Sequence, residues 1–159
     1  MSRLAEFVAS LEGCRLKAYD MEGDIAGVDT IGYGHLLTDD ERDSGLLEIG
    51  AEHVPWVDGI TKPQVVALLD QDLAPFIVCV QENVKVPLTP DQKIALVSFA
   101  YNCGCGALKR STLLRRLNNG EYEAVPGELG RWIKNNGRVM NGLVNRRLKE
   151  QAMWRGEIP

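Results

Sequence analysis

Carboxylic acids gather around a glycine-rich stretch near the N-terminus of this chain. The acids are Glu12, Asp20, Glu22, Asp24 and Asp29, and several glycines interrupt the segment that carries them. Cleavage of a glycosidic bond needs one protonated carboxyl group to assist the leaving oxygen and one carboxylate to activate water or stabilise positive charge. The pattern therefore admits glycoside hydrolysis, although acids in a loop are also typical of a solvated surface.

Other common chemistries lack the residues that they need. The chain has only two histidines, His35 and His53, so neither a three-histidine site nor an H-E-x-x-H zinc site can form. No G-x-S-x-G, P-loop or dinucleotide-binding motif is present. The net charge of −4 and the lack of a recognition motif argue against nucleic-acid binding. We therefore expect no metal, no cofactor and no nucleic-acid partner.

Two stretches of the sequence have a distinctive order of residues. The first is Glu12-Gly-Cys-Arg-Leu-Lys-Ala-Tyr19, and the second is Asp24-Ile-Ala-Gly-Val-Asp-Thr-Ile-Gly-Tyr-Gly-His35. They resemble the N-terminal signature of phage-type lysozymes of the T-even-like endolysin group, E-G-x-R-x-x-x-Y followed by D-x-x-G-x-x-T-I-G-x-G-H. Segments 68–72, 98–104, 111–115 and 142–147 are similar to later parts of that family. The resemblance covers residues 4–154.

The resemblance implies roles for three residues. Glu12 would be the general acid, Asp24 the carboxylate that orients water, and Thr30 a hydroxyl that helps to hold that water. The family places this aspartate closer to the preceding tyrosine, which implies an insertion of three residues here. Counting back from Thr30 selects Asp24, whereas counting from Glu12 points to Met21, which cannot ionise, beside Asp20. We favour Asp24 and keep Asp20 as the alternative.

Three further residues resemble the family's cleft wall. Tyr101, Asn102 and Thr112 would supply an aromatic face and polar groups that hold N-acetylated sugars. Each of them is equally compatible with a core or helix-capping position.

The resemblance also implies two charged pairs. His35 would form a structural pair with Asp72 rather than act in catalysis, and would contribute to stability. Either Arg146 or Arg147 would lie near Glu12, and the sequence does not say which.

Hydrophobic periodicity predicts the elements that carry the candidate site residues near the N-terminus. Leu4, Phe7, Val8 and Leu11 recur at helical spacing and predict a helix over 3–12, with Glu12 at its C-terminal end. Residues 15–34 lose this period, and their short runs between glycines predict a small antiparallel β region. The acidic stretch 36–60, broken by glycine and proline, predicts short helical turns joined by loops.

Capping boxes predict the starts of two longer helices. Thr61-Lys-Pro-Gln64 opens an apolar run that predicts a helix of about four turns or more, which Pro75 could kink. Thr89-Pro-Asp-Gln92 opens a helix that is apolar on most sides and therefore central to the core. Further helices are predicted over 111–118, 122–135 and 143–154, with a polar turn at 134–138.

These elements predict an α+β protein that is mostly helical, with a lysozyme-like two-lobed fold. We expect one domain, 1–159, with an N-terminal lobe over about 13–60 that carries the β hairpin region and a long connecting helix over about 61–82. The helical C-terminal lobe would cover about 83–159 and take in helix 3–12. Two lobes imply a cleft, the usual place for an extended substrate.

The sequence also bears on redox state and location. The cysteines Cys14, Cys79, Cys103 and Cys105 match neither a common zinc spacing nor a C-x-x-C motif, so we expect free, mostly buried thiols. We see no secretory signal and no apolar stretch long enough to span a bilayer. We therefore expect a protein of the host cytoplasm, without membrane insertion, that depends on a holin-type pore to reach the cell wall.

The resemblance implies an endolysin-like muramidase that acts as a monomer in host cell lysis. It would hydrolyse the β-1,4 bond between N-acetylmuramic acid and N-acetylglucosamine in peptidoglycan glycan strands, with inversion if the two carboxyls are far enough apart to admit a water. The three-residue insertion keeps open a catalytically inactive, lysozyme-like peptidoglycan-binding module. A lytic transglycosylase, which needs only the single acid, is a third alternative.

Overall fold

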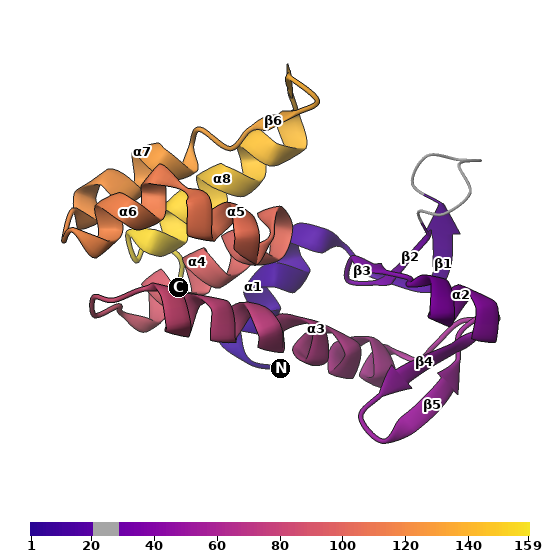
Figure 1. The fold of residues 1–159 in the computed structure, drawn as a ribbon. Helices are drawn as coiled ribbons and strands as arrows, with labels where there is room; N and C mark the ends of the chain where they lie inside the picture. The colour runs from indigo at the N-terminus through magenta and orange to yellow at the C-terminus, as the bar shows by residue number, and fades with distance from the viewer. Residues whose placement is uncertain (21–28) are drawn as a thin grey trace. The chain divides into compact units, whose positions relative to one another are not determined.

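The computed structural model describes residues 1–20 and 29–159 and divides the chain into two compact units, Met1–Ala74 and Pro75–Pro159. Helix α3 (Lys62–Asn83) runs from the first unit into the second, and the division falls at its internal proline, Pro75 (Figure 1). The fold is α+β and mostly helical, as the sequence predicts.

The first unit begins with the predicted helix and β region. Helix α1 (Arg3–Glu12) is capped by Ser2, whose Oγ accepts a hydrogen bond from the backbone N–H of Ala5 at 3.1 Å. Its apolar face is buried through Ala5, Phe7 and Val8. Three strands follow and form an antiparallel sheet in the order β1-β2-β3: β1 (Arg15–Asp20), β2 (Asp29–Gly32) and β3 (His35–Leu36). Both predictions are confirmed.

The prediction of helical turns over 36–60 is only partly right. Helix α2 (Asp39–Ser44) is one such turn, closed by a capping box between Thr38 and Glu41. Residues 46–55 instead form a β hairpin of β4 (Leu46–Ile49) and β5 (Glu52–Pro55). Leu47 and Ile49 are buried two residues apart on β4, and the buried Val54 of β5 pairs with Leu47. This alternation outweighs the acidic, glycine-broken composition on which the prediction rested.

Helix α3 begins at the predicted capping box. The backbone N–H of Gln64 donates to Thr61 Oγ1 at 3.3 Å, and that of Thr61 donates to Gln64 Oε1 at 2.8 Å. The helix is long and apolar enough to cross a membrane by length and composition alone, with a mean hydropathy of 1.4 over its most apolar window. The core helix of a folded protein passes the same test, and buried leucines at 68, 69 and 73 are typical of such a helix.

The second unit is built around helix α4 (Pro90–Cys103). Its capping box joins Thr89 and Gln92, as predicted. The seven consecutive residues 94–100 are all buried, so this segment has no solvent-exposed face. Helix α8 (Asn141–Trp154) is among the helices that pack on α4 (Figure 1).

In the rest of the second unit, the structure agrees less closely with the prediction from the sequence. Helix α6 (Thr112–Asn118) is predicted, whereas α5 (Cys105–Arg110) is not. The helix expected over 122–135 is a 3-10 turn, η1 (Tyr122–Ala124), followed by α7 (Val125–Leu129), because Gly127 and Gly130 weaken helix formation there. The expected polar turn joins β6 (Lys134–Asn135) to β7 (Arg138–Val139), with positive φ at Asn136 and Gly137.

One disulfide corrects the expectation of four free thiols. Cys79 of α3 and Cys105 of α5 are bonded, with their Cα atoms 6.0 Å apart and a sequence separation of 26. The pairing brings together residues on two different helices, which no local spacing motif can reveal. The prediction of free thiols is confirmed only for Cys14 and Cys103.

We predict that replacing Cys79 by alanine lowers the free energy of unfolding by about 3 kcal/mol, because an open chain gains the loop entropy that the disulfide removes. Urea unfolding with and without dithiothreitol measures the effect. The wild type should lose stability in reductant, and so should Cys14→Ala, which keeps the disulfide. A wild-type urea midpoint that reductant leaves unchanged would contradict the prediction.

Candidate active site

Glu12 is the last residue of α1 and its carboxylate lies against the turn between β2 and β3. Gly34 occupies this turn with φ +80°. A Cβ atom at position 34 would lie 2.9 Å from Glu12 Oε2, closer than real Cβ contacts occur. Only glycine therefore allows both the backbone conformation and the approach of the acid. The side chain of Glu12 is half-buried, so solvent or a ligand can still reach it.

Thr30 is held in the middle strand of the sheet. Its Cα pairs with that of Tyr19 on one side and that of Leu36 on the other. The residue is only 3% exposed, and its Oγ1 finds no hydrogen-bond partner among the residues that the structure describes. A buried hydroxyl without a partner is costly, so this atom is suited to holding a water or a ligand group.

The two alternatives for the second carboxylate cannot be compared by geometry. Asp24 lies outside the described residues. Asp20 is the last residue of β1, where its Cα pairs with that of Asp29. The preference for Asp24 therefore stays a prediction from the sequence.

His35 joins three elements of the first unit beside the Gly34 turn. Its Nδ1 lies 2.7 Å from Asp72 Oδ2 on α3, as expected, and its Nε2 lies 3.0 Å from Glu41 Oε1 on α2. Burial by itself lowers the pKa of His35, but the hydrogen bonds and negative charges of Asp72 and Glu41 together raise it to about 9. Burial likewise opposes the charged form of Glu41, yet the Thr38 backbone and His35 lower its pKa. Glu41 was missed by sequence reasoning, although its place in the capping box was a usable signal.

Two predicted substrate-binding residues occupy the last turn of α4 in the second unit. The ring of Tyr101 packs edge-on against Phe76, with the ring centroids 5.4 Å apart. Asn102 is exposed, and its Oδ1 accepts a hydrogen bond from Arg147 Nη2 at 2.7 Å. The structure therefore brings these two residues together on one helix end.

Thr112, the third predicted residue, is the first residue of α6. It lines a cavity of about 350 Å³ with Arg110, Ser111, Glu128, Arg131 and Trp132. The lining includes two arginines, Arg110 and Arg131, and one carboxylate, Glu128, which lies 3.1 Å from Arg131, so the cavity wall carries more positive than negative charge.

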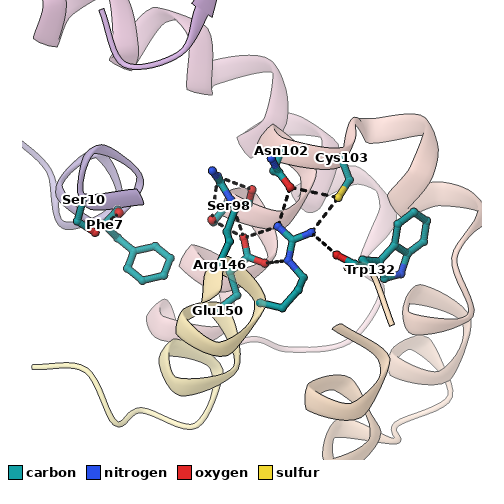
Figure 2. Close-up of polar contacts among 9 residues, drawn as sticks. Phe7, Ser10, Ser98, Asn102, Cys103, Trp132, Arg146 and Glu150 are labelled. Atoms are coloured by element: carbon teal, nitrogen blue, oxygen red, sulfur yellow. Dashed lines mark hydrogen bonds and ion pairs between the residues drawn. The ribbon is translucent and has the colours of Figure 1, made fainter. Parts of the chain in front are cut away.

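A buried ionic cluster lies behind Asn102 (Figure 2). Arg147 and Glu150 of α8 are 1% and 0% exposed, and Arg147 Nε lies 2.7 Å from Glu150 Oε1. Glu150 Oε2 accepts a hydrogen bond from Ser98 Oγ at 2.6 Å and lies 3.4 Å from Arg146 Nε. Burial raises the pKa of Glu150, while Arg147, Ser98 and Arg146 oppose that rise. Within 1–20 and 29–159, no group of three potential ligands could hold a metal ion.

Comparisons with known proteins show the family of this chain. The phage lysozyme family matches residues 9–150. The chain belongs to the phage lysozyme family. It is 39% identical over 152 residues to an endolysin of Bacillus phage PZA, covering 96% of this chain and 53% of that protein. It is 38% identical over 137 residues to an SAR-endolysin of Escherichia phage Mu, covering 86% of this chain and 71% of that protein.

Solved structures show the same lysozyme fold. An endolysin from Escherichia coli O157:H7 phage FAHEc1 has a TM-score of 0.79 and 31% identity, with 99% of this chain and 94% of that one covered. The muramidase domain of SpmX from Asticaccaulis excentricus has a TM-score of 0.74 and 31% identity, with 96% and 95% covered. This chain spans only about half the length of the PZA endolysin.

Gly34→Ala should reduce lysis of bacterial cells by about a hundredfold, because a shift of about 1 Å in a reacting group costs roughly that much in rate. The matched control is Gly50→Ala. Gly50 also has positive φ, +62°, but a Cβ there meets nothing within 4 Å. Both variants should lose about 1–2 kcal/mol of stability from the backbone alone. If both variants lose lytic rate equally, the close approach of Glu12 to Gly34 is not specifically required for activity.

The stability of the protein should fall as the pH rises from 6.5 to about 9. The folded state binds a proton at His35 that the unfolded state releases in this range, so the stabilisation is complete below 6.5 and lost on passing the folded pKa. Urea unfolding at pH 6 and pH 9.5 measures this slope, and His35→Asn should show a flatter dependence. If NMR, with the resonances of His35 assigned separately from those of His53, places the pKa of His35 near 6.5 in the folded wild type, the prediction is refuted.

Proposed function

We propose that this chain is a muramidase that hydrolyses the β-1,4 bond between N-acetylmuramic acid and N-acetylglucosamine in peptidoglycan. The observation that carries the proposal is the carboxylate of Glu12, held at the end of α1 against the turn at Gly34. Membership of the phage lysozyme family supports glycoside hydrolase activity, and the relatives are named endolysins and a muramidase. The whole chain, 1–159, would act as one lysozyme domain.

In the proposed mechanism, Glu12 is protonated and donates its proton to the glycosidic oxygen as the bond to the anomeric carbon breaks. A water attacks that carbon from the opposite face and loses its proton to Asp24. The Thr30 hydroxyl, which can both donate and accept, would hold this water through Oγ1, an atom with no hydrogen-bond partner in the described part of the chain. The products are a reducing sugar end of inverted configuration and a free hydroxyl on the leaving sugar.

Tyr101, Asn102 and Thr112 would bind the glycan strand in this proposal. Their places at the end of α4 and the start of α6 put polar and aromatic groups on helix ends, where side chains can face a ligand. The exposed amide of Asn102 suits a sugar acetamido group.

Peptidoglycan is the partner that the family supports, and the site of action is the cell wall. We propose that the protein acts as a monomer and leaves the host cytoplasm through a holin-type pore. Because a relative in phage Mu is named an SAR-endolysin, release from a signal anchor is the second candidate route. Expression with and without a holin separates these routes, since only the first requires the pore.

The deciding experiment is the clearing of outer-membrane-permeabilised cells by the wild type and by Glu12→Gln. Loss of the general acid should slow clearing by about 10²–10⁴-fold, and the wild type should release glycan with reducing muramic acid ends. Asp24→Asn should abolish activity while Asp20→Asn retains it, and the opposite result would transfer the role to Asp20. Anhydro ends would indicate a transglycosylase, and no clearing by the wild type would indicate an inactive binding module.

A further inference from the structure

Asn102 presents one edge of its amide to the surface and the other to a buried cation. Its Oδ1 accepts a hydrogen bond from Arg147 Nη2 at 2.7 Å. A guanidinium group has only N–H donors, so the amide atom that faces it must be the oxygen. The NH2 group of Asn102 therefore points away from Arg147, on a residue that is itself exposed.

Arg147 is held by hydrogen bonds from both of its Nη atoms and by an ion pair at Nε, although Nε makes no hydrogen bond among the described residues. Nη1 donates to Cys103 Sγ at 3.1 Å and to the carbonyl oxygen of Trp132 at 3.3 Å. Nε and Nη2 both face the carboxylate of Glu150, at 2.7 and 3.4 Å. The four partners of the Arg147 guanidinium, Asn102, Cys103, Trp132 and Glu150, are labelled in Figure 2. Its carbon also lies 5.2 Å from the ring centroid of Phe99.

Glu150 is fixed in turn from the opposite side. It is fully buried and receives a hydrogen bond from Ser98 Oγ at 2.6 Å. A buried ion pair adds little stability compared with apolar packing, so its presence behind an exposed amide requires another explanation. The chain Ser98, Glu150, Arg147 and Asn102 leads from the core of the second unit to its surface, and only the last member is exposed.

We propose that Arg147 is a positioning residue that makes Asn102 select N-acetylated sugars. This inference rests on the proposed function. An NH2 group held outward donates to the carbonyl oxygen of an acetamido group. The amino group of a de-N-acetylated sugar is a protonated donor at neutral pH, so it offers the NH2 group of Asn102 no acceptor. Fixing the amide in advance removes the entropy cost of orienting it on binding.

The test compares hydrolysis of soluble, peptide-free glycan strands from peptidoglycan with that of the same strands after chemical N-deacetylation. Arg147→Lys keeps a charge for Glu150, but a single ammonium cannot also hold Asn102. We expect the KM for acetylated strands to rise about tenfold, the value of one hydrogen bond, while kcat and the KM for deacetylated strands change less than about twofold. Arg155→Lys, at the exposed end of α8, is the control and should match the wild type.

A double-variant cycle distinguishes positioning from a general structural role. In an Asn102→Ala background, Arg147→Lys should have no further effect on KM, because the group through which it acts is gone. Additive effects, or an equal loss with both kinds of strand, would overturn the assignment.

A measurement on the wild type covers the case in which Arg147→Lys does not fold. The side-chain ¹⁵N–H resonances of Asn102 should shift on addition of acetylated strands and not with deacetylated ones. Shifts with both or with neither would overturn the assignment. If the wild type binds in this way but cleaves nothing, the proposed hydrolysis fails and the assignment stands.

Discussion

The first unit depends on the close approach of Glu12 to the turn at Gly34. The turn must be glycine, and it must stay where the carboxylate meets it, since any Cβ would displace the acid. The neighbouring residue, His35, secures this position by bonding to Asp72 of α3 and Glu41 of α2. Glu41 also closes the capping box of α2. One imidazolium thus joins a strand and two helices beside the candidate acid, and it does so because two carboxylates keep it charged.

In the second unit, too, charged side chains hold helices in position, but there the charges are almost fully buried. Removing Arg147 and Glu150 from water costs more than an exposed pair would. Their mutual attraction and the hydrogen bonds of Arg147 Nη1 and Nη2 and of Glu150 Oε2 offset part of this cost, although Arg147 Nε and Glu150 Oε1 make no hydrogen bond among the described residues. Such a network has few alternative arrangements, so it fixes the relation of α8 to the end of α4 more narrowly than apolar packing does. The side chains at that end of α4, including the amide of Asn102, are therefore held in a fixed orientation.

Sequence reasoning succeeded where the physical signal is local. Capping boxes located the starts of α3 and α4, and helical spacing located α1, because each depends on residues within a few positions of one another. It failed where partners lie far apart: the Cys79–Cys105 bond, and the ion pair of Arg147 with Glu150 as a support for Asn102. The hairpin over 46–55 was missed because its alternation is short and acidic. The roles of Glu12, Thr30 and Asn102 came from the resemblance to a family, which composition and periodicity could not supply.

The candidate residues share a placement at or beside the ends of rigid elements. Glu12 ends α1, Asn102 lies in the last turn of α4, and Thr112 begins α6. Backbone groups at helix ends lack intrahelical partners, so side chains there already take part in hydrogen bonds that set their direction. A polar side chain at such a position is held by a rigid scaffold yet remains accessible, whereas the same residue in mid-helix would be either buried or freely rotating. Supporting charges are needed only where the helix end alone does not orient the side chain, which is the case for the amide of Asn102 and the imidazole of His35.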